Sequence, residues 1–95
     1  DQTTKVKGMF VHPGQVAEVV KRHSQVGKAR LVVDNETGQD RMTLQCEVAG
    51  APDGLAEALA ASIRDVTKLR GEVMLCRPGE LPNDGKVIDD ARKYD

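Results

Sequence analysis

Residues 42–48 read Met42-Thr43-Leu44-Gln45-Cys46-Glu47-Val48, and this stretch decides the fold. Apolar and polar side chains alternate along it, which is typical of a strand with one buried face and one face in water. Upstream, Ala29 to Val33 is an apolar run rich in β-branched residues, and the polar residues 34–40 have the composition of a hairpin loop. The sequence therefore predicts an antiparallel pair of strands.

One helix is predicted before this pair in the sequence, and a second helix is predicted after it. The first opens at Pro13, which suits the first helical turn. Apolar residues recur at spacings of three and four in both segments, so each helix should bury one face; these residues are Val16, Val19 and Val20 in the first, and Leu55, Leu59, Ile63 and Val66 in the second.

Further strands complete the predicted fold. Glu72 to Cys76 is a third main strand, and two very short strands turn at Gly8 near the N-terminus. The fold class is therefore α+β: a small antiparallel sheet with two helices packed on one face, in a βαββαβ-like (ferredoxin-like) order, plus a short N-terminal β-hairpin.

Composition narrows the possible functions. The chain has 95 residues, enough for one small domain, and 14 basic against 15 acidic residues, which favours neither nucleic acid nor a membrane surface as partner. With only two aromatic residues, the core is too modest for a deep substrate pocket and a catalytic apparatus together. Cys46 and Cys76 lie in apolar runs and are predicted to be buried free thiols. Without a signal peptide or a spanning apolar run, the expected location is the cytoplasm.

Few residues have the spacing that catalysis or metal binding needs. His12 and His23 have no cysteine or carboxylate at ligand spacing, so no metal site is predicted. The charge-mixed residues 89–93 are expected to form a solvated tail. The remaining candidates are the glycine hairpin at Lys7-Gly8 and the segment Leu81-Pro82-Asn83-Asp84-Gly85-Lys86-Val87.

The second candidate presents a single lysine. Pro82 fixes its own backbone angle, Asn83 and Asp84 favour a turn, and Gly85 is free to adopt a positive φ. Lys86 should therefore leave a tight turn and precede an apolar pair. A solvated turn lysine with no further role is the alternative interpretation of this pattern.

Two parts of the chain resemble a known family. The N-terminal residues from Asp1 to Val11, with Pro13, resemble the segment that follows the hinge in AMP-forming acyl-CoA ligases. Residues 69–73 and 81–94 resemble the end of the same enzymes, and the phenylacetate–CoA ligases in particular. The resemblance covers nearly the whole chain in the family's order.

The resemblance implies that residues 1–95 are a C-terminal lid domain whose partner is the enzyme's own large N-terminal adenylation domain. In the family, an acid attacks the α-phosphate of ATP to give acyl-AMP and diphosphate, and after the lid rotates coenzyme A takes the acyl group. The implied substrates are ATP, coenzyme A and an aryl acid, most closely phenylacetate, with Mg²⁺ in the full-length enzyme. The domain alone should be inactive and bind no cofactor. The full-length enzyme could form a homodimer.

The resemblance also assigns roles to individual residues. Lys86 matches the lysine that catalyses adenylation, supported by the turn residues Asn83, Asp84 and Gly85. Asp1 matches the hinge. Gly8 lies in the hairpin that approaches the coenzyme A tunnel, and Lys7 could face the coenzyme A phosphates.

Two alternatives remain open from the sequence. A stand-alone regulatory module that binds a small molecule would have a similar fold and would give Lys86 no role. A related synthetase could also use the same lid with another acid, because the lid does not contact the side group of the acid.

Overall fold

The predicted central pair forms in the computed structural model, which describes residues 2–50 and 52–94. β3 (Val26–Asp34) pairs antiparallel with β4 (Arg41–Val48), and Leu31 lies opposite Leu44 while Val33 lies opposite Met42. All four side chains are almost completely buried. Burying one apolar side chain of this size is worth about 1.5–3 kcal/mol, so this face of the pair forms the centre of the core.

The sheet is mixed. Its strand order is β5-β4-β3-β6, with β5 (Glu72–Cys76) parallel to β4 and β6 (Ile88–Asp90) parallel to β3. The predicted α+β class, with two helices on one face, is confirmed, but the antiparallel, ferredoxin-like pairing is corrected to a mixed one. Side-chain alternation shows which face of a strand is buried, but it does not show the direction of the strand. Direction is set here by α2 (Leu55–Thr67), which returns the chain along the sheet before β5 begins.

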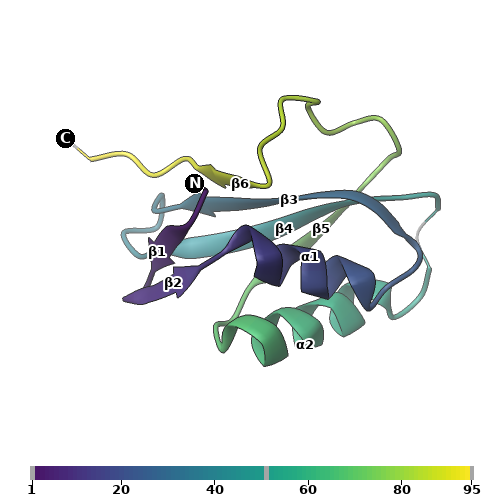
Figure 1. The fold of residues 1–95 in the computed structure, drawn as a ribbon, viewed down its shortest axis with the longest axis horizontal. Helices are drawn as coiled ribbons and strands as arrows, with labels where there is room; N and C mark the ends of the chain where they lie inside the picture. The colour runs from purple at the N-terminus through teal and green to yellow at the C-terminus, as the bar shows by residue number, and fades with distance from the viewer. Residues whose placement is uncertain (1, 51, 95) are drawn as a thin grey trace.

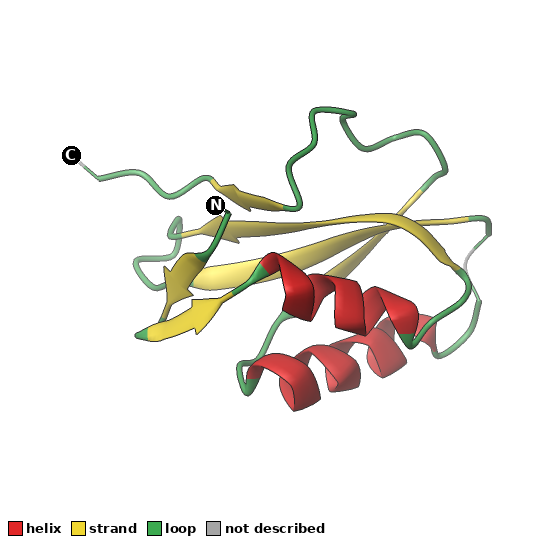
Figure 2. Ribbon diagram, in the orientation of Figure 1, coloured by secondary structure: helices red, strands yellow, loops and turns green. Residues whose placement is uncertain are grey.

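Two helices cover one face of this sheet. α1 (Pro13–Lys21) and α2 lie side by side below it (Figures 1 and 2). α1 buries Val16 and Val19, and α2 buries Leu55, Leu59 and Ile63, as their spacing predicts. Neither helix within residues 2–50 and 52–94 combines the length and the apolarity that crossing a bilayer requires.

The N-terminal hairpin forms a separate two-stranded sheet. β1 (Thr4–Val6) pairs with β2 (Met9–Val11) across a two-residue turn. Both turn residues have positive φ, 49° at Lys7 and 82° at Gly8, as a type I′ hairpin turn requires. Val6 and Val11 reach the main core, so the hairpin is anchored to the domain.

A long segment connects β5 to β6 and carries the candidate lysine. Residues 77–87 arch over one end of the sheet before the chain pairs with β3 (Figure 1). The described N-terminal residues lie beside β6 in the same view, where Gln2 bonds the N–H of Ile88.

Candidate functional site

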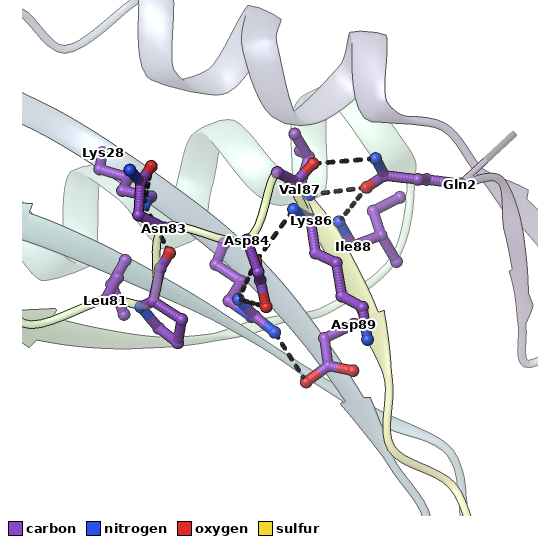
Figure 3. A network of polar contacts seen from close by, with 12 residues as sticks. Gln2, Lys28, Leu81, Asn83, Asp84, Lys86, Val87, Ile88 and Asp89 are labelled. Carbon is purple, nitrogen blue, oxygen red and sulfur yellow. Dashed lines mark hydrogen bonds and ion pairs between the residues drawn. The ribbon is translucent and has the colours of Figure 1, made fainter.

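Residues 83–87, called the lysine turn below, present Lys86 to solvent. The Lys86 side chain is exposed and extends towards Asp89 (Figure 3). Asp89, however, is paired with Arg30, at 3.2 Å. Across residues 2–50 and 52–94, the Lys86 ammonium has no salt bridge or hydrogen bond, whereas its backbone N–H is bonded to the carboxylate of Asp84. The ammonium is therefore available to a group from outside the described part of the chain.

A buried arginine supports the turn from the sheet. Arg30 lies on β3 with only 8% of its side chain exposed, and its Nη1 donates to both carboxylate oxygens of Asp84, at 2.9 and 3.1 Å. Asp84 in turn accepts the backbone N–H of Lys86, at 3.1 Å. This N–H and then the guanidinium lower the pKa of Asp84 below its ordinary value of 3.8, so the carboxylate stays charged.

Gln2 binds the lysine turn from the opposite end of the chain. Its Oε1 accepts the backbone N–H groups of Val87, at 2.6 Å, and Ile88, at 3.1 Å. Its Nε2 donates to the carbonyl of Gly85, at 3.1 Å. One amide side chain thus bonds the backbone on both sides of Lys86 (Figure 3).

Other contacts fix the segment leading into the turn. The Lys28 ammonium donates to the carbonyl of Pro82 and to the side chain of Asn83. The Glu47 carboxylate accepts the backbone N–H of Leu81, at 2.9 Å, and the Leu81 side chain is buried. The segment therefore approaches Lys86 along a defined path.

Gly85 is required by its backbone conformation. Its φ is +76°, and a Cβ added there would meet no atom within 4 Å. The space around Gly85 is therefore open, and what a side chain would cost is the left-handed backbone geometry.

The second predicted site, the Lys7-Gly8 turn, is positioned by Asp40 and Arg92. Asp40 accepts the backbone N–H of Lys7, at 2.8 Å, and pairs with Arg92, at 3.2 Å. The Arg92 guanidinium also donates to the carbonyl of Lys5, at 2.7 Å. Its side chain is only 10% exposed. The prediction of a solvated tail is therefore corrected at Arg92, because this residue binds the hairpin instead of water.

The structure places the predicted residues in two groups. Lys86, with Asn83, Asp84 and Gly85, lies at one end of β6. Lys7 and Gly8 lie in the hairpin, which Arg92 binds beyond the other end of β6. Within the described ranges, no hydrogen bond or ion pair joins the two groups directly. Asp1, the predicted hinge, lies outside the described residues.

The residues that support these sites were not identified from the sequence, Gln2, Arg30 and Arg92 among them. A charged residue inside the apolar run 29–33 is a signal that could have identified Arg30, because an arginine in a buried strand needs a charged partner. Gln2 and Arg92 carry no comparable local signal. The Gly85 carbonyl lies 83 residues from Gln2 and the Lys5 carbonyl lies 87 residues from Arg92 in the sequence.

The histidines and cysteines have structural surroundings. The His23 ring lies 2.8 Å from the hydroxyl of Ser62 and connects α1 to α2, while the His12 ring lies 3.0 Å from the hydroxyl of Thr3. Cys46 and Cys76 are buried free thiols, which confirms that prediction. Searching residues 2–50 and 52–94 finds no group of three or more side chains that could hold a metal ion.

Comparison with known proteins identifies the class of domain. Residues 8–92 match the family described as AMP-binding enzyme C-terminal domain, and the chain belongs to this family. The resemblance seen in the sequence is thereby confirmed. No sequence among the curated proteins matches the chain significantly.

Several solved structures share the fold. A domain of phenylacetate-coenzyme A ligase from Bacteroides vulgatus ATCC 8482 aligns with a TM-score of 0.87 and 20% identity, over 100% of this chain and 97% of that one. The 2-hydroxyisobutyryl-CoA ligase solved with 2-HIB-AMP and CoA in its thioesterification state aligns with a TM-score of 0.85 and 19% identity, over 98% of this chain. This chain spans only 22% of that ligase. A structure from a study of fatty acyl-adenylate ligases from E. coli and L. pneumophila aligns with a TM-score of 0.72 and 18% identity. The match covers 90% of this chain and 16% of that one.

Proposed function

We propose that residues 1–95 are the C-terminal lid domain of an AMP-forming acid–CoA ligase that acts with its own N-terminal adenylation domain in the cytoplasm. Membership of the AMP-binding enzyme C-terminal domain family supports this proposal. The similarity to 2-hydroxyisobutyryl-CoA ligase supports it as well, because the region that matches this chain makes up only 22% of that ligase. In this proposal Asp1 is the hinge residue.

Lys86 is assigned to the first half-reaction. A carboxylate oxygen of the acid attacks the α-phosphorus of ATP, a P–O bond forms, and diphosphate leaves. Two anions approach each other in this step, and negative charge grows on the phosphoryl oxygens. The ammonium of Lys86, on its flexible stem, can bridge the acid and the phosphate and stabilise that charge.

One observation carries this assignment: the backbone of Lys86 is fixed while its ammonium is free. Asp84 bonds the N–H of Lys86, and Gln2 bonds the neighbours on both sides. No internal ion pair within residues 2–50 and 52–94 competes for the ammonium. A pre-positioned, unpaired cation is what electrostatic stabilisation of a transition state requires.

The Lys7-Gly8 hairpin is assigned to the second half-reaction. In this step the thiol of coenzyme A attacks the acyl carbon of acyl-AMP, and AMP leaves. Next to the turn, Met9 is 43% and Phe10 62% exposed, which leaves apolar surface for a neighbouring domain or for the pantetheine chain. Lys7 lies beside this surface, where its charge would attract a phosphate of coenzyme A.

We propose phenylacetate as the acid substrate. Its support is the resemblance of residues 69–73 and 81–94 to phenylacetate–CoA ligases, together with the fold shared with the Bacteroides domain. A panel of phenylacetate, other aryl acids and 2-hydroxyisobutyrate, offered to the full-length enzyme, tests this choice. Mg²⁺ accompanies ATP in the proposal, and no step is assigned to a metal bound by the described residues of this chain.

Replacing Lys86 by alanine in the full-length enzyme tests its role. We expect adenylation to slow by about 10²–10³-fold, as for the loss of other electrostatic stabilisers. Thioester formation from supplied acyl-AMP should change little, because the phosphoryl transfer is already complete. The two steps are followed separately, as diphosphate release and as acyl-CoA formation.

The matched control is Lys93→Ala, which removes another exposed lysine from the same end of the chain. It should leave both half-reactions unchanged. Equal losses in the two half-reactions of the Lys86→Ala enzyme would contradict the assigned role.

A further inference from the structure

Gln2 lies where it can control the conformation of the lysine turn. It precedes β1, yet the three hydrogen bonds that its side chain makes within the described residues all reach residues 85–88. Its Oε1 accepts two consecutive N–H groups, and its Nε2 donates to the Gly85 carbonyl. The amide therefore brackets Lys86 on both sides.

One of the bonded N–H groups, that of Ile88, lies on the outer edge of β6, and the other, that of Val87, immediately precedes this strand. On its inner side this strand pairs with β3, where the Leu31 N–H donates to the Val87 carbonyl. On the outer side, the described part of the chain contributes no further strand, and the Gln2 amide takes the place of one. An edge strand only three residues long has few other bonds to keep it in register.

Arg30 and Gln2 constrain different atoms. The Arg30–Asp84 pair fixes the N–H of Lys86 itself. Gln2 fixes the carbonyl before Lys86 and the N–H after it. With both in place, the direction in which the Lys86 side chain leaves the backbone is defined. Without Gln2, the Lys86–Val87 peptide group would lose the bond to its N–H, and the Gly85–Lys86 peptide group would keep only the bond from its N–H to Asp84.

We propose that Gln2 is a positioning residue for Lys86: its amide holds the backbone on both sides of the lysine in the geometry that adenylation needs. This inference rests on the proposed function of Lys86. An amide is the side chain that fits, because the site needs one acceptor and one donor together. A carboxylate of the same size would supply only the acceptor.

The first test measures amide hydrogen exchange in this chain. Gln2→Met keeps the length of the side chain and removes every hydrogen bond. We expect exchange at Val87 and Ile88 to accelerate about tenfold, the equivalent of one or two neutral hydrogen bonds. Amides of β4 should keep their protection, which shows that the variant is folded. Unchanged exchange at both Val87 and Ile88 would overturn the proposal.

The second test uses the full-length enzyme. Gln2→Met should lower kcat of adenylation about tenfold with an unchanged KM for ATP, and should spare thioester formation from supplied acyl-AMP. Gln2→Glu, which keeps the acceptor but loses the donor, should fall between the wild type and Gln2→Met. Gln39→Met, at an exposed glutamine of the β3–β4 loop, is the matched control and should behave as the wild type.

The outcomes separate this inference from the function it rests on. If Lys86→Ala slows adenylation but Gln2→Met does not, the positioning role is refuted while the role of Lys86 stands. If Lys86→Ala leaves adenylation unchanged, the proposed function fails and the catalytic part of this inference fails with it. In that case faster exchange at Val87 and Ile88 would still establish the structural contact.

Discussion

At the scale of single residues, the lysine turn depends on one unusual backbone angle. Gly85, with φ at +76°, reverses the chain between Asp84 and Lys86. Nothing fills the space where its Cβ would lie. The effect of a side chain at this position is therefore a direct measure of backbone strain, without a contribution from steric overlap.

Gly85→Ala should destabilise the turn by about 1–2 kcal/mol, the cost of a left-handed conformation for an L-residue. Denaturant unfolding, combined with amide exchange at residues 84–88, measures this cost. Gly14→Ala is the matched control: Gly14 lies in α1, has open space at its Cβ and no positive φ, and should gain about 0.5 kcal/mol. Equal stability changes in the two variants would contradict the argument from φ.

The sequence predicted this turn and its lysine, because proline, asparagine, aspartate and glycine define a turn locally. It did not predict the partners of the turn. The bonds from Gln2 to Gly85 and Val87 span 83 and 85 residues, and no local pattern records a contact of that range. The apolar run around Arg30 predicts a strand but does not indicate that Asp84 and Asp89 pair with this arginine.

At the scale of elements, alternation and helical spacing predicted the helices and the central strands, because backbone geometry sets those periods and burial of one face makes them visible in the sequence. The parallel pairings of β5 and β6 could not be predicted in the same way. Both depend on where the chain re-enters the sheet, which is decided by the path of α2 and of residues 77–87. β6 itself is short, and its last residues are charged, so it was interpreted as part of a solvated tail.

β6 also carries the most strongly perturbed carboxylate of the hairpin network. The Arg92 guanidinium, 2.8 Å away, lowers the pKa of Asp90 from 3.8 to about 2. Because the folded state binds this proton less tightly than the unfolded state, the stabilisation is complete above about pH 4 and is lost as the pH falls towards 2.

Asp90→Asn should therefore lower stability at pH 7 and flatten its decline between pH 4 and 2, a window bounded by the two pKa values. The effect should be modest, since the Asp90 side chain is 43% exposed and partly screened by water. Urea midpoints recorded across this range provide the measurement. Asp53→Asn, at an exposed position before α2, is the control, and a parallel decline in all three proteins would refute the assignment.

At the scale of the whole molecule, two polar networks surround one short strand. Gln2 and Arg30 bind the lysine turn before β6, and Arg92 binds the hairpin after it. The two surfaces assigned to the two half-reactions are thus parts of a single packed unit. A lid that turns as one body would move both surfaces together.

The rate at which the buried thiols are alkylated measures how often the domain unfolds. Cys46 is completely buried, and burial raises its pKa to about 11, so at neutral pH the folded chain presents almost no thiolate. Iodoacetamide should label Cys46 only as fast as the domain unfolds, whereas the chain in denaturant should be labelled at once. Mass spectrometry of the alkylated peptide follows both rates. Labelling of the native domain as fast as the denatured chain would show that the core opens locally.

The clasp between Gln2 and residues 85–88 has a consequence for biosynthesis. A ribosome releases the glutamine 83 residues before the glycine to which it bonds. A nascent chain that already contains the hairpin, both helices and most of the sheet therefore still lacks a correctly shaped lysine turn. Shaping of the turn is therefore one of the last events in the maturation of the domain, and truncated translation products would fold in large part without it.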